Sequence, residues 1–361
     1  MNTVIKNLAF LSASAGVGLY SLANTSYSAL EFGSRDMLKG EVAQSLEARF
    51  ENALPIKEFG VNLWSAFRYV VFGAGETGLV IGQSGWLFTD EEFFAPENAD
   101  VNLVQNLKTI AGVSDLLANR GVELVVVPVP AKARVHQDKL ETRPDSFHQH
   151  LYGNFIDFLA NQHITHIDTA QTFLASGGDL YFKTDTHWLP EAAALVASEL
   201  GATYGNQNAR QFEVIEVGHA TLRGDLLNYV PVDPWFSSIA PPQELLSTFN
   251  IVPISSELDL FADAPAPEVA LVGTSYSANS AWNFEGALKL ELNRDVMNFA
   301  TEGEGPITPM LSFIENYLDQ LPELELVVWE IPERYLATNH ATELPMLSIP
   351  ATQTLAANTN F

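Results

Sequence analysis

The chain of 361 residues contains no cysteine. This absence excludes disulfide bonds, thiol catalysis and thiolate metal sites. Basic residues are also scarce, because 18 lysines and arginines stand against 44 aspartates and glutamates, which gives a formal net charge of -26. Such a charge repels long polyanions on average, so the composition argues against nucleic acid as a partner. The same repulsion makes a strongly anionic polymer an awkward substrate.

Long apolar stretches are scarce as well, and one near the N-terminus stands alone. Leu8 to Leu22 carries no charge and follows Lys6, and its length fits the hydrophobic region of a signal peptide better than a full membrane span. We therefore predict that residues 1–29 form a signal peptide or, if uncleaved, an anchor in the inner membrane. Either form places the rest of the chain in the periplasm. A buried N-terminal helix is the alternative interpretation.

The remaining sequence has the pattern of a globular α/β protein. Hydrophobic residues make up 47% of the chain, which suffices for a packed core. Apolar residues recur at helical spacing from Asn102 to Asn119, and Gly121 follows as a helix-ending residue. The run from Glu123 to Pro130 is almost continuously apolar, as in a strand buried on both faces. Further strands are expected at 269–272, 295–300 and 324–331, and further helices at 146–162 and 308–320. This alternation predicts a mostly parallel central sheet.

The same pattern suggests where the chain divides. We predict a helical lead-in over residues 30–79, a main domain over 80–336 that opens with a hairpin, and a flexible tail over 337–361. Within the main domain, residues 203–260 are rich in proline and aromatic side chains. We interpret this segment as an insertion or a lid over a substrate groove.

One short stretch carries a pattern typical of acid–base chemistry. Asp185 and His187 are two positions apart, so in extended backbone both side chains point the same way. A carboxylate placed like this orients an imidazole, which can then take a proton from a nucleophile. Pro190 and Glu191 follow and fit the first turn of a helix. A structural histidine with a neighbouring aspartate is the alternative.

The best candidate for the nucleophile lies far downstream. The apolar strand Val269 to Val272 runs into Gly273 and then Ser275, and a tight turn there exposes a hydroxyl at the strand exit. Ser277 and Ser280 are competing nucleophiles, and an ordinary turn explains the same residues.

Two further groups of residues follow predicted strands. Lys132 and Arg134 come just past the strand that ends near residue 130, where open α/β sheets bind ligands, although a solvated loop explains them too. Gly303 and Gly305 follow the strand at 295–300, and glycines let backbone amides approach a ligand closely, as an oxyanion hole requires. A plain loop is the alternative there.

A metal site is a less favoured interpretation. Imidazole and carboxylate groups are transition-metal ligands, and such groups recur at five positions. These are His163, His166, Asp168, Asp185 and His187. Their spacing gives little support, so no metal is assigned.

Six stretches in one order resemble the family of exported alginate O-acetyltransferases, whose domain is GDSL/SGNH-hydrolase-like. The stretches are Gly85–Phe88, Pro128–Lys132, Thr184–Trp188, Gly273–Ser277, Gly303–Pro306 and Trp329–Arg334, and together they span about residues 80–336. The resemblance implies a three-layer SGNH-hydrolase-like fold with insertions. It also implies a catalytic triad of Ser275 as nucleophile, His187 as general base and acid, and Asp185 as the residue that orients His187.

The resemblance extends to other site residues and to partners. It implies oxyanion or substrate-binding roles for the Ser275 amide and for Gly303, Gly305, Tyr276, Lys132 and Arg334. It further implies no cofactor, a polysaccharide acceptor, and an acetyl donor relayed by a membrane-bound O-acyltransferase. The chain looks like the shorter, N-terminally anchored type without an appended carbohydrate-binding module. The resemblance implies alginate or a similar exopolysaccharide as the acceptor, and the net charge argues against a tight grip on alginate and favours another exopolysaccharide.

Three other functions remain open on the residues alone. An esterase that removes acetyl groups would use the same triad. A non-catalytic scaffold would bind polysaccharide with an aromatic surface and keep a decayed catalytic domain. A metal-dependent hydrolase would use the histidines and aspartates named above and would lose activity on chelation.

Overall fold

The computed structural model describes residues 15–21, 23, 44, 47–49, 57–206, 211–254 and 267–339. Much of the expected signal or anchor segment, and the expected tail from residue 340 onward, lie outside these residues. Among the described helices, none has the length and apolarity needed to cross a bilayer. The chain divides into two compact units. One comprises residues 1–76 and 228–241, and the other comprises residues 77–227 and 242–361.

The first unit is built around the helix α4 (Lys57–Phe72). This helix packs against the segment 228–241 that returns to it from the middle of the chain. Phe59 contacts the rings of Trp235 and Phe236, each with centroids 5.7 Å apart, and Asn62 donates a hydrogen bond to the carbonyl of Pro231. The aromatic part of the predicted insertion therefore belongs to this unit. The segment includes the short 3-10 helix η5 (Ser237–Ile239).

The second unit is organised by a five-stranded sheet in the order β4-β3-β9-β7-β8. All four pairings in this sheet are parallel, as the alternating pattern predicts. The strands are β3 (Glu123–Val129), β4 (Thr165–His166), β7 (Val269–Val272), β8 (Val296–Asn298) and β9 (Leu326–Pro332). Every residue of β7 and β9 is buried, which explains why these segments read as continuous apolar runs.

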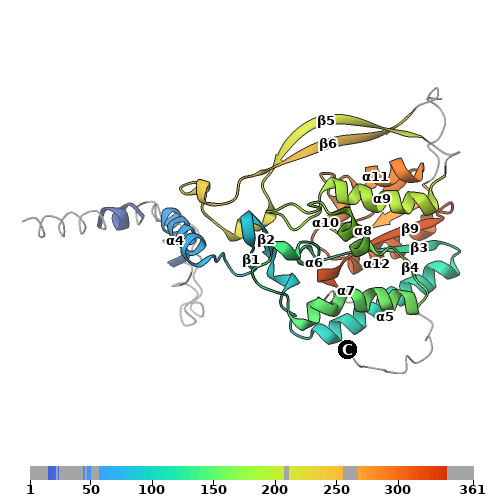
Figure 1. The fold of residues 1–361 in the computed structure, drawn as a ribbon, viewed down its shortest axis with the longest axis horizontal. Helices are drawn as coiled ribbons and strands as arrows, with labels where there is room; N and C mark the ends of the chain where they lie inside the picture. The colour runs from blue at the N-terminus through green and yellow to red at the C-terminus, as the bar shows by residue number, and fades with distance from the viewer. Residues whose placement is uncertain are drawn as a thin grey trace, which may run out of the picture. The chain divides into compact units, whose positions relative to one another are not determined.

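Helices cover both faces of the sheet and make it the middle of three layers (Figure 1). One layer contains α5 (Ala99–Asn119), α7 (Ser146–Asn161) and α12 (Ile307–Asn316). The other contains α8 (Thr169–Ser176), α9 (Pro190–Tyr204) and α11 (Phe284–Leu292). Leu124 and Val126 of β3 join the core beside α5, whereas Val125 and Val127 join the core beside α9. Alternate side chains of one buried strand thus supply two cores.

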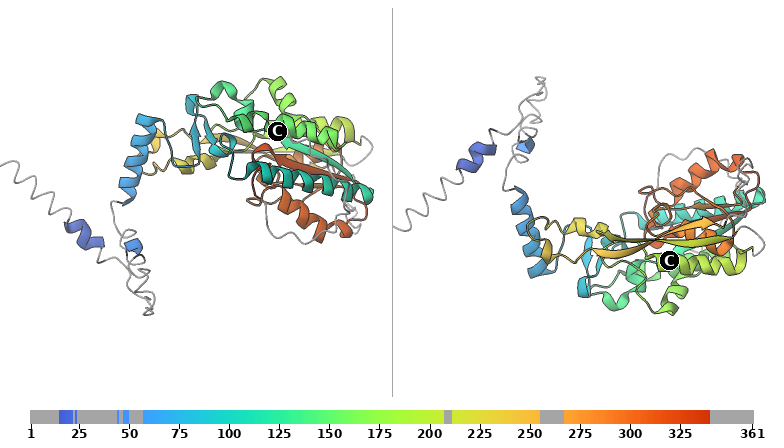
Figure 2. Two further views of the ribbon diagram at one scale, coloured as in Figure 1. Left: turned by 90° about the horizontal axis from the view of Figure 1, so that it is seen from below. Right: turned by 90° about the horizontal axis from the view of Figure 1, so that it is seen from above.

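Two antiparallel elements are added to this arrangement. The predicted hairpin is formed by β1 (Leu79–Ile81) and β2 (Leu87–Thr89), with the 3-10 helix η1 (Gln83–Gly85) between them. The second element is a long ribbon of β5 (Phe212–Leu222) and β6 (Glu244–Pro253), drawn in yellow and yellow-orange (Figures 1 and 2). Residues 203–260, interpreted as an insertion or lid, therefore contain a ribbon that contacts α11.

Short helices follow the carboxyl ends of the parallel strands and carry most of the residues of chemical interest. β3 leads into α6 (Lys132–Val135), β7 into α10 (Ser275–Ala278) and β9 into the 3-10 helix η7 (Glu333–Tyr335). Because the strands are parallel, these segments meet at one edge of the sheet, where α/β proteins place their ligands. The remaining short elements are η2 (Asp90–Glu92), η3 (Gln137–Lys139), η4 (Asp225–Tyr229) and η6 (Leu318–Gln320).

Candidate active site

The turn between β7 and α10 presents Ser275 at the edge of the sheet. Thr274 precedes it, and its side-chain hydroxyl accepts a hydrogen bond from the Tyr276 amide at the start of the helix. Gly273 is required here, since a Cβ atom at this position would lie 2.5 Å from a carboxylate oxygen of Glu330. The end of β7, Gly273 and the Thr274 cap together place the Ser275 hydroxyl just outside the sheet. The sequence predicts it at this position.

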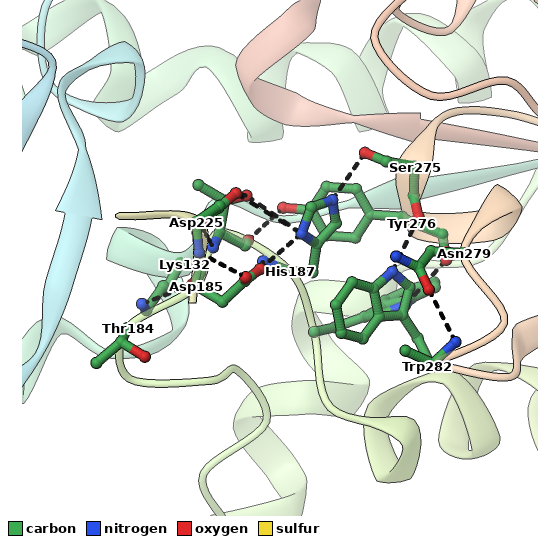
Figure 3. Close-up of polar contacts among 12 residues, drawn as sticks. Lys132, Thr184, Asp185, His187, Asp225, Ser275, Tyr276, Asn279 and Trp282 are labelled. Atoms are coloured by element: carbon green, nitrogen blue, oxygen red, sulfur yellow. Dashed lines mark hydrogen bonds and ion pairs between the residues drawn. The ribbon is translucent and has the colours of Figure 1, made fainter. Parts of the chain in front are cut away.

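Asp185 and His187 lie in the loop that precedes α9, and their side chains form a relay with Ser275 (Figure 3). The Nδ1 atom of His187 is 2.6 Å from Oδ1 of Asp185, and its Nε2 atom is 2.7 Å from Oγ of Ser275. The same carboxylate oxygen accepts the His187 backbone amide at 2.9 Å. Asp185 therefore favours the tautomer with a proton on Nδ1, which leaves Nε2 free to accept the serine proton.

The Asp185 carboxylate is held ionised behind the imidazole. Its side chain is buried, and burial alone would raise its pKa. The hydrogen bonds and charge of His187, together with the amide of Asp225, outweigh that effect and hold the pKa of Asp185 below its usual range. A buried carboxylate that stays charged can stabilise an imidazolium when one forms.

Asp225 is a second carboxylate at this position that sequence analysis did not identify. It accepts hydrogen bonds from the amide and hydroxyl of Thr186, at 2.9 and 2.6 Å. Its Oδ2 atom is 3.9 Å from Nδ1 of His187, well beyond the distance of Asp185. Asp225 thus braces the loop and adds negative charge near His187, while Asp185 makes the direct hydrogen bond.

Aromatic rings enclose His187 on two sides. The indole of Trp282 lies parallel to the imidazole with centroids 4.8 Å apart, and its Nε1 donates to the Ser275 carbonyl at 2.9 Å. The Tyr276 ring is 4.7 Å from His187, and its hydroxyl donates to the Thr186 carbonyl at 2.7 Å. Tyr276 is buried, so in this structure its side chain supports His187 from within the fold.

Lys132 does not face a substrate, and the expectation that it does is wrong for this structure. The side chain is buried beneath the site, and its ammonium donates to the carbonyls of Leu87, Lys183 and Asp185 at 2.5, 3.0 and 2.9 Å. Three acceptors use its three protons. Burial lowers the pKa of Lys132 to about 8, which still leaves it charged at neutral pH. The lysine ties the Asp185 loop to β2.

The neighbouring cations are also held in internal contacts. Arg134 pairs with the buried Glu333 at 2.6 Å, so it links α6 to η7. Arg334 is 7% exposed, and its guanidinium lies over the rings of Tyr276 and Tyr335. Burial opposes its charge, but the surrounding tyrosines and glutamates raise the pKa of Arg334 above its ordinary value. Arg334 therefore contacts the Tyr276 ring, which in turn contacts His187.

The competing serines differ from Ser275 in their surroundings. Ser277 is buried, and its hydroxyl donates to Glu330 at 3.0 Å, so it is occupied away from His187. Ser280 is exposed, and it makes no hydrogen bond to His187 within the described part of the chain. Glu330 is fully buried and also accepts the Thr274 amide at 2.7 Å. Burial raises the pKa of Glu330 to about 7.

Gly303 and Gly305 lie in the loop after β8, with φ values of 79° and 66°. The first part of this loop is tied to the exit of β7, because the amides of Phe299 and Thr301 donate to Leu271 and Gly273 carbonyls. The positive φ values explain the glycines as turn residues. Their proposed role in an oxyanion hole stays a prediction.

The five residues of the metal hypothesis do not gather at one place. Among the described residues, the group of side chains close enough to hold an ion is Asp185, His187 and Asp225. His163 is exposed, and Asp168 caps α8 by accepting the Gln171 amide. Two of the five residues, Asp185 and His187, therefore lie together, and Asp225 joins them as a group that the metal hypothesis did not include. Within the triplet, the carboxylate oxygens already accept hydrogen bonds from the loop.

Comparison with known proteins gives consistent results. The family model described as "SGNH hydrolase-like domain, acetyltransferase AlgX" matches residues 79–333. The chain is 40% identical over 314 residues to "Probable alginate O-acetylase AlgJ" of Azotobacter vinelandii, covering 83% of this chain and 80% of that protein. It is 40% identical over 321 residues to the protein of the same name from Pseudomonas aeruginosa, with 83% and 81% covered. Among solved structures, the "O-Acetyltransferase Domain of Pseudomonas putida AlgJ" matches with a TM-score of 0.68 and 36% identity, covering 75% of this chain and 97% of that one.

Proposed function

The chain belongs to the family of SGNH hydrolase-like acetyltransferase domains typified by AlgX, and from this premise we propose that it is an O-acetyltransferase acting on the hydroxyls of an exopolysaccharide, alginate or a similar polymer. We propose Ser275 as the nucleophile, His187 as the general base and acid, and Asp185 as the residue that orients His187. The observation that carries this assignment is the unbroken relay of 2.6 and 2.7 Å from Asp185 through His187 to Ser275.

The reaction proceeds in two half-reactions. Nε2 of His187 takes the proton of Ser275 as Oγ attacks the acetyl carbon of the donor, and the same imidazole returns a proton to the leaving oxygen. An acetyl-serine results. A sugar hydroxyl then gives its proton to Nε2 of His187 and attacks the acetyl carbon, and Ser275 leaves with the proton restored. Backbone amides, among which Ser275, Gly303 and Gly305 are the candidates, stabilise the oxyanion in both steps.

Location and partners follow from the same premise. We place the protein in the periplasm, anchored to the inner membrane if the segment up to residue 29 is not cleaved. The acetyl donor is relayed by a membrane-bound O-acyltransferase, and the acceptor is the polysaccharide. Co-purification of the full-length chain with that acyltransferase from detergent-solubilised membranes tests the partnership.

Substitution of the three relay residues tests the chemistry. With a chromogenic acetyl ester, we expect Ser275→Ala to lower hydrolysis by at least about 1,000-fold, because among the described residues Ser275 supplies the hydroxyl that contacts Nε2 of His187. Ser280→Ala is the matched control and should retain activity. Mass spectrometry of the wild-type protein quenched during turnover should find one acetyl group on the peptide containing Ser275. Full activity in Ser275→Ala would overturn the assignment.

Transfer and hydrolysis are separated by the fate of the acetyl group. Adding oligosaccharides cut from alginate to the chromogenic assay should divert acetyl groups from water to sugar. Acetylated oligosaccharide is the expected product. Release of acetate alone, unchanged by the oligosaccharide, would identify an esterase instead.

A further inference from the structure

A groove of about 590 Å³ lies between the β5–β6 ribbon and the segment that runs from α10 into α11. We call it the ribbon groove. Leu246, Thr248 and Ile251 of β6 line one side of it. Ser277, Asn279 and Asn283 line the other. Its volume falls in the range of roughly 300–1,000 Å³ that is usual for ligand sites.

Part of the ribbon groove is lined by residues that closely follow the nucleophile in the chain. Ser277 and Asn279, which line it, follow Ser275 by two and four positions in the same turn of chain. The Asn279 amide and the Trp282 indole both donate to the Ser275 carbonyl. This part of the groove wall is therefore fixed directly to the proposed acyl-carrying residue.

The opposite wall is fixed to the other half of the relay. Glu244, the first residue of β6, accepts hydrogen bonds from the Thr184 amide and hydroxyl at 2.8 and 2.7 Å. Thr184 precedes Asp185, so these hydrogen bonds tie the beginning of the ribbon to the Asp185–His187 loop. Both walls of the groove are therefore hydrogen-bonded to segments that carry the relay.

The chemistry of the ribbon groove suits a sugar chain. Of the described residues that line it, the charged ones are Glu285 and Lys289, and these pair with each other at 2.6 Å. The net charge of the chain is -26, so an anionic sugar is repelled less in this neutral groove than by the chain on average. Amide and hydroxyl side chains line the groove to hydrogen-bond sugar hydroxyls, and Phe249 offers an apolar face.

We propose that the ribbon groove binds the acceptor polysaccharide and presents one of its hydroxyls to the acetyl-serine. This inference rests on the proposed function, since it names the acceptor subsite of that reaction. The β5–β6 ribbon is then the element that distinguishes a polymer acceptor from water. The ribbon affects the transfer of acetyl from Ser275 to the sugar and does not affect the formation of acetyl-serine.

Blocking the ribbon groove tests the proposal. Thr248→Trp fills it from the ribbon side and Ser280→Trp from the α10 side. Ser247→Trp is the matched control, because Ser247 is adjacent to Thr248 but is not among the residues that line the groove, and its hydroxyl contacts His219. Each variant is assayed for hydrolysis of the chromogenic ester and for acetyl transfer to oligosaccharides cut from alginate. Thermal unfolding verifies that each is folded.

We expect both blocking variants to hydrolyse the ester within about twofold of wild type but to lose at least about tenfold in transfer, with a raised KM for the oligosaccharide. Ser247→Trp should retain both activities. Unchanged transfer in Thr248→Trp and Ser280→Trp would overturn the groove assignment and leave the proposed function intact. Equal loss of hydrolysis and transfer in folded variants would also overturn it, because the groove would then act on the first half-reaction. Failure of the proposed function itself is distinct, since it shows as activity retained by Ser275→Ala.

Discussion

The imidazole of His187 contacts the hydroxyl of Ser275 at 2.7 Å although the two residues are 88 positions apart in the sequence. The contact arises because β7 delivers Ser275 to the carboxyl edge of the sheet, while the loop before α9 brings His187 over the same edge. Trp282 and Tyr276 fix the imidazole in place from two sides. The sheet edge and two short loops therefore hold the relay together. The residues that position His187 and Ser275 can be substituted one at a time.

The two carboxylates near His187 should differ sharply in importance. Asp185→Asn replaces the acceptor that contacts Nδ1 at 2.6 Å with a group that can present a proton instead. We expect ester hydrolysis to fall by at least about 100-fold, because the favoured tautomer is lost. Asp225→Asn, at 3.9 Å, should cost less than about tenfold. Steady-state kinetics of ester hydrolysis by the two folded variants tests this prediction. A larger loss of activity in Asp225→Asn than in Asp185→Asn would assign the orienting role to Asp225.

Removal of metal ions should leave the reaction unchanged. The carboxylate oxygens of Asp185 and Asp225 are engaged by backbone and side-chain donors of the loop, and His187 is engaged by Asp185 and Ser275. Dialysis against a chelator, followed by the ester assay with and without added divalent ions, is expected to give the same rate. A loss that zinc restores would favour a metal-dependent hydrolase.

Lys132 should matter for stability as well as for activity. Lys132→Met keeps the length of the side chain but removes the ammonium that donates to the carbonyls of Leu87, Lys183 and Asp185. The Lys183 carbonyl still accepts the Leu87 amide, so the loss falls on the carbonyls of Leu87 and Asp185. Because buried acceptors without partners are costly, we expect the free energy of unfolding in urea to fall by about 2–4 kcal/mol. The matched control is Lys139→Met. The Lys139 ammonium contacts Asp138 at the surface, so this variant should keep nearly the stability of the wild type. Equal effects of the two substitutions would contradict the assigned role.

Lys132 also illustrates how far sequence reasoning reaches. The parallel sheet and the strand exits follow from apolar runs between helical patterns, and the structure confirms them. The spacing of Asp185 and His187 is local, so their side-chain arrangement was predictable. Whether a cation after a strand points to solvent or into the fold depends on which distant carbonyls surround it. Those of Leu87 and Lys183 come from segments about 45 and 51 positions away.

The residues that were missed share the same physical reason. Asp225 and Trp282 reach His187 only after the chain has folded, and neither belongs to a recognisable spacing pattern. The one local signal was Gly224 before Asp225, since a Cβ at Gly224 would lie 2.1 Å from the Thr184 carbonyl oxygen. A glycine alone is an ordinary turn residue, however, so it does not reveal the close approach.

Trp282 should affect the chemical step more than the fold. Trp282→Phe retains a ring beside His187 but removes the indole proton that is donated to the Ser275 carbonyl. We expect kcat for ester hydrolysis to fall by about tenfold, because the α10 turn that carries the hydroxyl is less restrained. Trp188→Phe offers a comparison, since its indole donates to the Tyr276 carbonyl one residue later. Unaltered kcat in Trp282→Phe would show that the hydrogen bond from the indole to the Ser275 carbonyl is not needed to position the hydroxyl.

Glu330 should make stability depend on pH. Its pKa is raised by burial from 4.5 to about 7, so the folded protein binds this proton more tightly than the unfolded chain does. The contribution is therefore greatest at low pH and is lost as pH rises from about 4.5 to about 7, by an amount on the order of 3 kcal/mol. Glu330→Gln has the same shape but cannot ionise, which removes this contribution.

The measurement is the free energy of unfolding of wild type and Glu330→Gln at a series of pH values. We expect the wild type to lose stability relative to the variant between pH 4.5 and 7 and the difference to be constant above that range. Glu92, whose pKa burial also raises to about 7, is unchanged in both proteins and cancels in the comparison. A difference that does not vary with pH would mean that Glu330 has the same pKa in the folded protein as in the unfolded chain. In that case the hydrogen bonds from Thr274 and Ser277 would balance the cost of burying its charge.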